Sequence, residues 1–182
     1  MYTQELKVPK DRVGVLIGVK GEFKRRLEKK TGAKIEIDSE TGDVTISGED
    51  SIMLYQLKDV VLAVGRGFSD QVAAKLLKEE TLLDITNVQD YAGKSKKKLD
   101  RLRGRVIGEN GRSRRTIEQL SDTDISVYGK TVAVIGEPEN VAMARNAIDS
   151  LLSGSPHGNV YKWLEKKRRQ MTKRAFESAI AH

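Results

Sequence analysis

The chain has 182 residues, of which 38% are hydrophobic, and it carries a formal net charge of +7 at pH 7. That length can bury one or two small hydrophobic cores but not a large enzyme core. Because the chain contains no cysteine, disulfides, thiolate metal sites and thiol catalysis are excluded.

The N-terminal residues predict no targeting or membrane segment. No apolar run reaches the roughly eighteen residues that span a bilayer, and Met1–Glu5 lack the charge and apolar stretch of a signal peptide. We therefore expect a cytoplasmic protein.

The positive charge is uneven: residues 1–65 hold eleven basic and eleven acidic side chains, whereas residues 91–182 carry a net charge of +9. If nucleic acid binds, we expect the second half to supply most of the long-range attraction.

The predicted elements begin with a strand at residues 5–8, which Pro9 ends, and a short helix at residues 11–17, which Gly18 stops. A second helix follows Gly21 and ends at Gly32, a good C-terminal cap. Residues 34–37 and 44–46 alternate on either side of a polar turn, which predicts a β-hairpin.

A longer helix then begins after Asp50 or Ser51, either of which is a suitable N-cap. Its apolar residues are dense enough that we expect them to be largely buried. They are Ile52, Leu54, Tyr55, Leu57, Val60, Val61 and Val64. Residues 68–78 predict a further helix capped by Ser69, which makes this stretch a structured connector and not a flexible linker.

The second half repeats this order of elements. It predicts a strand at residues 82–87, a helix from about Ser95, a helix to Leu120, strands at 124–128 and 131–136, and a helix opened by Pro138. Gly129 and Lys130 form the two-residue turn of the second hairpin.

A G-x-x-G tetrapeptide joins the two short helices in each half. Gly18-Val19-Lys20-Gly21 returns ninety positions later as Gly108-Glu109-Asn110-Gly111, and Ile35-Glu36-Ile37 returns as Ile125-Ser126-Val127. A single copy without matching flanks is most often a simple helix-to-helix turn. Two copies with matching flanks over some fifty residues indicate a duplicated module.

This module resembles the KH domain, an RNA-binding fold in which a G-x-x-G loop joins two helices and holds the nucleic-acid backbone. The resemblance implies an α+β fold with two tandem type I KH domains. Each has the order β-α-α-β-β-α and a three-stranded antiparallel sheet packed on helices. We expect the first KH domain at residues 1–66, a helical connector at 67–81, the second KH domain at 82–155 and a basic C-terminal helix at 156–182.

Glycines let a main chain approach phosphates closely, and the N-terminus of the following helix offers unpaired N–H groups. We expect bases to lie over a groove whose apolar floor is Ile35 or Ile37 in the first module and Ile125 or Val127 in the second. The predicted RNA-binding residues are those four and the ones in and just after each loop: Gly18, Val19, Lys20, Gly21, Lys24, Arg25, Gly108, Glu109, Asn110, Gly111, Arg112, Arg114 and Arg115.

Lys20 lies inside the first loop and is the best single candidate for a phosphate contact. Glu109 in the second loop should repel a phosphate, and the arginines that follow it compensate. Both copies also depart from the usual KH pattern, because the third residue after the second glycine is commonly aliphatic in that family but is Lys24 and Arg114 here. Either the grooves are more basic than most or the helix is slightly shifted.

A narrower resemblance covers nearly the whole chain. The chain looks like the archaeal counterpart of the two-KH ribosome-assembly factors called "partner of NOB-one". The resemblance is carried by the second module and by four short stretches: Gly65–Ser69, Ala73–Leu77, Ala144–Ile148 and Gly154–Tyr161. The resemblance implies binding to small-subunit ribosomal RNA near its 3′ end. It also implies work beside the endonuclease that trims this end and in the same pathway as the dimethyladenosine transferase. The first G-x-x-G is typically degraded in eukaryotic members but is intact here.

The C-terminal residues 159–180 have helical spacing, with an apolar stripe and two basic runs. We favour a helix whose stripe packs on the second module, so that Trp163 is a packing anchor; base stacking and a partner's groove are the alternatives. The basic run Lys94–Lys98 is either a solvated helix start or a patch that steers phosphates.

Catalysis has little support, because the two histidines, His157 and His182, form no triad or metal cluster, and we expect no cofactor. We therefore predict a non-enzymatic protein that holds single-stranded ribosomal RNA during pre-rRNA processing. The alternatives are a general single-strand adaptor in RNA turnover and a protein-interaction scaffold whose KH folds no longer bind RNA.

Overall fold

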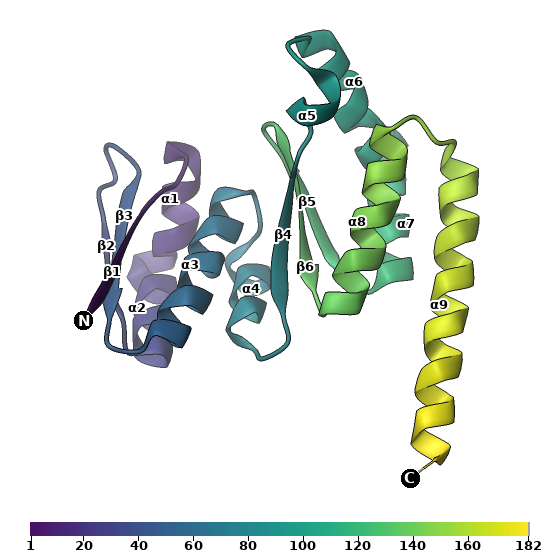
Figure 1. Cartoon of the computed structure of the whole chain (residues 1–182). Coiled ribbons are helices and arrows are strands. Elements are labelled where there is room, and N and C mark those ends of the chain that lie inside the picture. Colours follow the sequence, from purple (N-terminus) through teal and green to yellow (C-terminus); the bar gives the residue numbers. More distant parts are fainter. Residues whose placement is uncertain (182) are drawn as a thin grey trace. The chain divides into compact units, whose positions relative to one another are not determined.

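The computed structural model describes residues 1–181, which divide into two compact units, residues 1–83 and residues from 84 onward (Figure 1). Each unit is a three-stranded antiparallel sheet with helices on one face. Within the described residues, no helix combines the length and the apolar character needed to cross a membrane.

In the first unit the middle strand of the sheet is the last in sequence, so that the strand order is β1-β3-β2. Ile35 of β2 lies opposite Ile46 of β3, and Leu6 of β1 opposite Val44 of β3. The elements are β1 (Tyr2–Lys7), α1 (Lys10–Ile17), the 3-10 turn η1 (Val19–Gly21), α2 (Glu22–Thr31), β2 (Lys34–Ile37), β3 (Asp43–Gly48), α3 (Ser51–Gly65), α4 (Asp70–Ala73) and the 3-10 turn η2 (Ala74–Leu77).

The second unit repeats this topology with strand order β4-β6-β5. Its elements are β4 (Leu82–Asn87), α5 (Gln89–Ala92), α6 (Lys96–Ile107), the 3-10 turn η3 (Glu109–Gly111), α7 (Arg112–Ser121), β5 (Asp124–Tyr128), β6 (Thr131–Gly136), α8 (Pro138–Leu152) and α9 (His157–Ile180). The predicted type I KH order, β-α-α-β-β-α, is therefore confirmed in both halves.

Each unit has its own hydrophobic core between the sheet and the helices. Equivalent residues of the two repeats fill it: Leu27 and Ile117 from the second KH helix, and Ile46 and Val134 from the central strand, are all fully buried. The helix ends follow the expected capping chemistry. The Asp50 carboxylate accepts hydrogen bonds from the N–H groups of Ile52 and Met53, so that Asp50, and not Ser51, is the N-cap of α3.

Three sequence expectations need correction. Ile52 and Tyr55 of α3 are 69% and 58% exposed, because the dense apolar run of this helix covers more of its circumference than the sheet does. The connector helix is broken after Ala73 into a four-residue α-helix and a 3-10 turn. Helix α5 was not expected, because four residues carry too little periodicity to be recognised.

A cluster of charged and polar residues holds β4, α5 and α8 together in the second unit. Arg145 donates two hydrogen bonds of 2.9 Å to the Asp84 carboxylate and one of 3.3 Å to Asp149. The hydroxyl of Tyr91 donates to Asp149 at 2.8 Å. Burial, followed by this hydrogen bond, raises the pKa of Tyr91. Arg145 lies in one of the stretches that carry the narrower resemblance, and its role in the structure is to position β4.

A glutamate of the second KH helix caps the outer edge of the sheet in each unit. The Ile35 N–H donates to the Glu28 carboxylate at 2.8 Å, and the Ile125 N–H donates to Glu118 at the same distance. Both N–H groups belong to edge strands, where no neighbouring strand is available to accept them. The glutamate therefore fixes the distance between the helix and the edge strand, which are the two sides of the predicted groove.

We expect Glu118→Ala to lower the free energy of unfolding of the second unit by about 1–2 kcal/mol, because it leaves the Ile125 N–H without a protein acceptor. Glu118→Gln keeps an acceptor oxygen and is the matched control, with an expected loss below about 1 kcal/mol. Denaturant unfolding followed by the fluorescence of Trp163, the only tryptophan, measures both. Equal losses in the two variants would contradict this role.

Candidate nucleic-acid interface

The two G-x-x-G loops have almost the same backbone conformation. The first glycine has φ 78° and ψ 172° at Gly18, and φ 73° and ψ 174° at Gly108. This region of backbone conformation is essentially restricted to glycine. The agreement of both angles to within a few degrees shows that the duplicated sequence forms a duplicated loop.

The first glycine of each loop is also required by close packing. A Cβ added at Gly18 would lie 2.7 Å from the Cβ of Phe23, and one added at Gly108 would lie 2.6 Å from the Cβ of Ser113. The backbone N of the same residue would be 2.8 Å and 2.7 Å away, respectively. The loop therefore folds directly against the start of the next helix, and only glycine fits.

The middle of each loop is open to solvent. Lys20 and Asn110 both adopt the left-handed conformation, with φ 52° and 51°. Val19 is 79% exposed, and Glu109 is exposed at the equivalent position. No side chain caps the N-terminus of α2 or α7. The first N–H groups of these helices and the positive ends of their dipoles are thus free of a side-chain cap, which is the arrangement that binds phosphate in proteins.

Arginine side chains fold over the second glycine of each loop. The Nη1 atom of Arg25 lies 3.2 Å from the position of a Cβ at Gly21, and that of Arg115 lies 3.0 Å from the position of a Cβ at Gly111. Both arginines are exposed. Each loop therefore has a guanidinium beside a helix N-terminus that no side chain caps, where a phosphate would lie.

The residues at the third position after the second glycine, Lys24 and Arg114, are half-buried, whereas the preceding residues, Phe23 and Ser113, are in the core. Lys24 Nζ lies 3.6 Å from the Glu28 carboxylate, which caps the edge strand. Lys24 thus lies along the side of the groove. Phe23, the residue before it, packs in the core at the start of the helix. Arg112 is exposed on the first turn of α7.

Burial decides between the alternative floor residues. Ile35 and Ile125 are 0% and 3% exposed, so they belong to the core and offer no surface to a base. Ile37 and Val127, two residues further along the same strands, are half-buried. Ile37 and Val127 are therefore the members of each pair with apolar surface left for a ligand.

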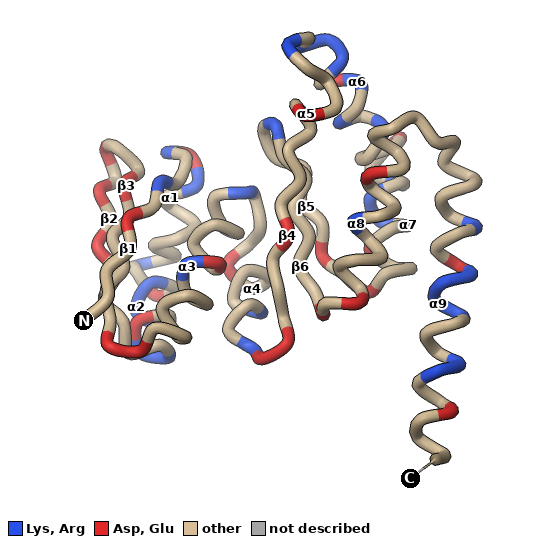
Figure 2. The backbone as a smooth tube through the Cα atoms, viewed as in Figure 1, with Lys and Arg blue, Asp and Glu red and all other residues tan. Residues whose placement is uncertain are grey.

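The charges around the two loops differ. Figure 2 shows lysines and arginines at the start of α6, on α7 and along α9, whereas in the first unit basic and acidic residues alternate. On β2 the Lys34 ammonium binds Glu36 at 2.5 Å, and this hydrogen bond raises the pKa of Lys34 and lowers that of Glu36. Both groups are charged at neutral pH, so the pair adds no net charge to the first groove.

The C-terminal helix α9 packs on α7 and α8 (Figure 1), and in its second half Arg174 still donates a hydrogen bond to Glu139 at the start of α8. Val160 and Leu164 are buried, as the apolar stripe predicts, and Trp163 is half-buried. Arg168 donates a hydrogen bond of 2.6 Å to the Gln119 carbonyl at the end of α7. The expectation of packing holds as far as Met171, which is half-buried, and fails at the end of the helix, where Phe176 and Ile180 are 66% and 68% exposed.

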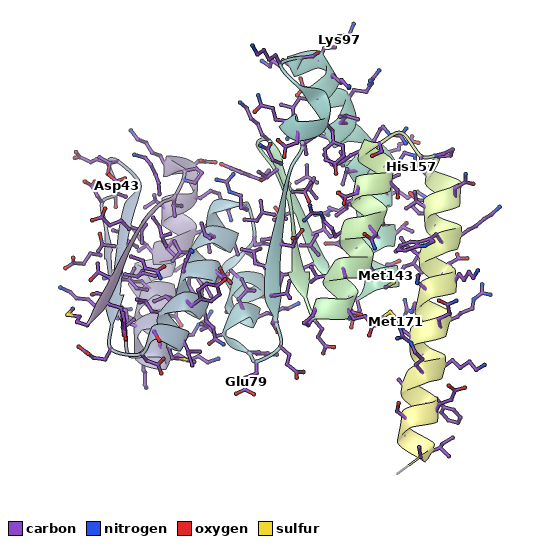
Figure 3. All side chains as sticks on the ribbon, in the orientation of Figure 1. Asp43, Glu79, Lys97, Met143, His157 and Met171 are labelled. Carbon is purple, nitrogen blue, oxygen red and sulfur yellow. The ribbon has the colours of Figure 1, made fainter. Side chains whose placement is uncertain are left out.

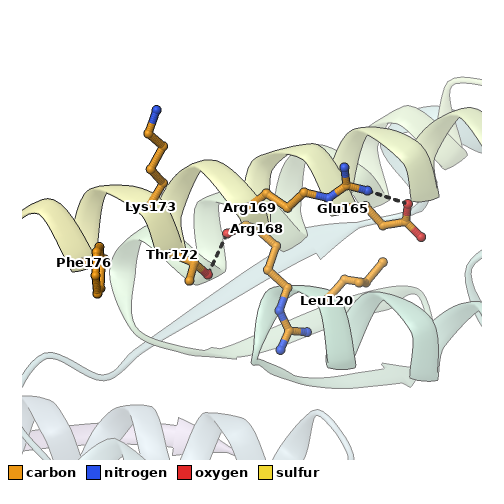
Figure 4. A pocket seen from close by; sticks show the side chains of 7 residues that line it. All are labelled: Leu120, Glu165, Arg168, Arg169, Thr172, Lys173 and Phe176. Carbon is orange, nitrogen blue, oxygen red and sulfur yellow. Dashed lines mark hydrogen bonds and ion pairs between the residues drawn. The ribbon is translucent and has the colours of Figure 1, made fainter.

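An open groove lies between the end of α7 and residues 165–176 of α9 (Figure 4). Leu120 lines it from α7 and Arg168 extends toward Leu120 from α9, whereas Lys173 points away from α7. The run Lys94–Lys98 is exposed, and Lys97 projects away from the second unit in Figure 3. Ser95 caps α6 by accepting a hydrogen bond from the Lys98 N–H.

Sequence reasoning missed the two capping glutamates. Their signal was present, because Glu28 and Glu118 occupy the same position of the repeat, ninety residues apart. Among the described residues, no group of three or more histidine, aspartate or glutamate side chains could hold a metal ion.

Two G-x-x-G loops of the same geometry, each between the first two helices of a β-α-α-β-β-α unit, define a tandem type I KH protein. A model of the KH domain matches residues 3–61, and a model of the eukaryotic-type KH domain, type I, that forms the second domain of PNO1 matches residues 82–169. The chain belongs to the PNO1/Dim2 family of KH-domain proteins.

Three relatives illustrate the relationship. The KH domain-containing protein MJ0443 of Methanocaldococcus jannaschii is 47% identical over 94% of this chain and 77% of its own length. The pre-rRNA-processing protein PNO1 of Chaetomium thermophilum is 33% identical over 69% of this chain and 48% of its own length. In a solved complex of a/eIF2alpha, aDim2p and rRNA from Pyrococcus horikoshii OT3, the matching chain has a TM-score of 0.85. It is 47% identical, over 93% of this chain and 95% of that chain.

Proposed function

We propose that this protein binds single-stranded small-subunit ribosomal RNA near its 3′ end during pre-rRNA processing and ribosome assembly. The observation that carries the proposal is the pair of G-x-x-G loops, each of which precedes a helix N-terminus without a side-chain cap and has an arginine beside it. The printed names of its relatives support the choice of RNA, because one is a pre-rRNA-processing protein and another was solved in a complex with rRNA.

In mechanism, the basic surface of the second unit attracts the RNA, and each loop then holds the phosphate backbone at the start of the following helix. These contacts carry no sequence information. Bases that turn inward lie on Ile37 or Val127. The apolar floor contacts the face of any base, and hydrogen bonds from neighbouring polar groups to the edge of the base provide selectivity. We take the RNA-binding modules to be residues 1–66 and 82–155, joined by the connector 67–81 and followed by the basic helix 156–182.

Two modules on one chain gain affinity by binding one strand, since the second contact becomes intramolecular. A strand held in this way is presented to a processing enzyme or protected from it. We propose the endonuclease that trims the 3′ end and the rRNA dimethyladenosine transferase as the enzymes that act beside the protein. The protein itself contributes binding and not catalysis, in the cytoplasm.

The decisive experiment is cross-linking of the protein to RNA in cells that express it, followed by sequencing of the cross-linked RNA. We expect a peak at the 3′ end of the small-subunit rRNA, and we expect it to shrink in a variant with Arg25 and Arg115 both changed to Glu. A diffuse profile over many RNAs would instead indicate a general single-strand adaptor. Absence of cross-linked RNA would indicate a protein-interaction scaffold.

A further inference from the structure

The strongest difference between the two repeats lies on the outer side of the G-x-x-G loop. In the second unit an open pocket of about 460 Å³ lies between the end of α6, the start of α7 and the first turns of α9. We call it the outer pocket. Its main residues are Arg101, Arg105, Arg112, Ser113, His157 and Tyr161.

The outer pocket is separate from the base groove. On α6, Arg101 and Arg105 face the outer pocket, whereas Asp100 and Arg103 face the turn Gly129-Lys130 between β5 and β6. Neither Ile125 nor Val127 lines the outer pocket. A strand that leaves the groove over the loop would therefore meet the outer pocket next.

The equivalent residues of the first unit have the opposite character. Ninety positions before Arg101 and Arg112 stand Asp11 and Glu22, and before Arg105 stands Val15. The backbone of the loop is the same in both units, so this change does not serve the loop itself. At this place in the repeat two acidic residues are replaced by arginines, although Glu109 lies on the rim and offsets one of the charges.

Helix α9 completes the outer pocket with two aromatic rings that have no equivalent in the first unit. His157 Nε2 lies 2.8 Å from the carbonyl oxygen of Arg105, and its ring is 6.1 Å from that of Tyr161 in an edge-to-face arrangement. The guanidinium of Arg105 in turn donates to the carbonyls of Leu151 and Ser155. These bonds fix the start of α9 against α6 and hold the Tyr161 ring, half-buried, at the side of the pocket. Figure 3 shows His157 at the first turn of α9.

One polar group in the outer pocket has no partner in the protein. Ser113 is 1% exposed, lines the pocket, and its buried hydroxyl makes no hydrogen bond within the described residues. Its equivalent in the first unit is Phe23, which fills the same space with carbon. A buried hydroxyl without a partner is costly unless a ligand or water completes it. The substitution of a polar for an apolar residue thus coincides with the change of charge.

We propose that the outer pocket binds one further nucleotide of the same RNA strand, beyond those held in the base groove of the second unit. Arg101 and Arg112 bind its phosphate, Tyr161 stacks on its base, and the Ser113 hydroxyl is the hydrogen-bonding group at the bottom of the pocket. This inference rests on the proposed RNA-binding function, and it extends the recognised length of the strand on one side of the loop. The first unit, with Asp11 and Glu22, lacks such a site.

The test uses the full chain and randomised RNA oligonucleotides of four to seven nucleotides, each extended at its 5′ or its 3′ end. For the unmodified protein we expect extension at one end, and not at the other, to raise the affinity about tenfold. Arg101→Asp, which installs the residue of the first repeat, and Tyr161→Leu, which keeps apolar bulk without a stacking face, should each remove this gain. Tyr161→Leu should bind the four-nucleotide RNA as the unmodified protein does, and Arg101→Asp should bind it as the charge control Lys167→Asp does.

The control is Lys167→Asp, which makes the same change of charge on an exposed part of α9 outside the pocket. It should keep the gain on extension. Loss of the gain in this control as well would show a long-range effect of charge and overturn the subsite. A gain that survives in both pocket variants, or no gain at either end while the four-nucleotide RNA binds, would overturn it too. No binding of any RNA would refute the proposed function itself and with it the subsite. Near-ultraviolet circular dichroism of each variant checks that the fold is intact.

Discussion

Gly108→Ala is expected to lower the free energy of unfolding of the second unit by about 3 kcal/mol or more and to abolish RNA binding there. The added methyl would lie 2.6 Å from the Ser113 Cβ and 2.7 Å from its backbone N, closer than real Cβ contacts. The backbone at Gly108 also has φ 73° and ψ 174°, a conformation that costs any other residue about 1–3 kcal/mol. To avoid this clash the loop must move away from α7. That movement breaks the contact between Gly108 and Ser113, which holds the loop against the start of α7.

The matched control is Gly104→Ala, four residues earlier in the same helix. A Cβ at Gly104 meets nothing within 4 Å, and the residue has ordinary helical dihedrals. Alanine there should raise the stability by about 0.5–1 kcal/mol, because glycine in a helix interior loses more conformational entropy on folding. Unfolding in denaturant followed by Trp163 fluorescence separates the two variants. If Gly108→Ala were as stable as the unmodified protein, the loop would not need its glycine.

The duplicated sequence predicted the fold well, because both the periodicity and the punctuation of the elements are local. Gly32 caps α2 in the left-handed conformation, and the turn Gly129-Lys130 closes the second hairpin between Tyr128 and Thr131, as expected. Both are consequences of a single residue's backbone preference. The repeat added a check that a single module does not offer, since each predicted element had to occur twice.

The expectations that failed depend on what packs against what. Ile52 belongs to a dense run of apolar residues and was therefore expected in the core. It is exposed, because the position of the sheet decides which face of α3 is covered. Phe176 continues the helical spacing of Val160 and Leu164, but α9 extends past the body on which it could pack. Ile35 and Ile37 share one face of a strand, yet Ile35 is fully buried and Ile37 is half-buried. The sequence pattern does not show which of these residues another element of the fold covers.

The candidate site divides in the same way. The loops were predictable because glycine spacing and helix punctuation define them. The capping glutamates and the outer pocket were not, because their members come from positions that are far apart in the chain, such as Arg101 and Tyr161. What the sequence did contain was the contrast between repeats, for example Asp11 against Arg101. Such a contrast becomes interpretable only when the structure shows that the two residues occupy equivalent positions before the two loops.

Arg115→Glu is expected to weaken RNA binding by more than tenfold, whereas Arg25→Glu should weaken it only about two- to threefold. The two arginines are matched: both are exposed, both fold over the second glycine of a loop, and both substitutions change the charge by the same amount. The difference comes from their surroundings, since residues 91–182 carry a net charge of +9 and residues 1–65 carry none. RNA held mainly by the second unit loses more when a phosphate contact there is reversed.

Salt titration distinguishes this explanation from a simple loss of folding. Each lost phosphate contact on a single strand should reduce the slope of log affinity against log salt by about 0.7. Arg115→Glu should therefore bind with a shallower slope, while a partly unfolded protein would keep the slope and lose only active fraction. Equal losses in the two variants, or a larger loss in Arg25→Glu, would mean that the intact first loop, with Lys20 inside it, binds as strongly as the second. Local phosphate contacts at the first loop would then contribute more to RNA affinity than the net positive charge of the second unit does.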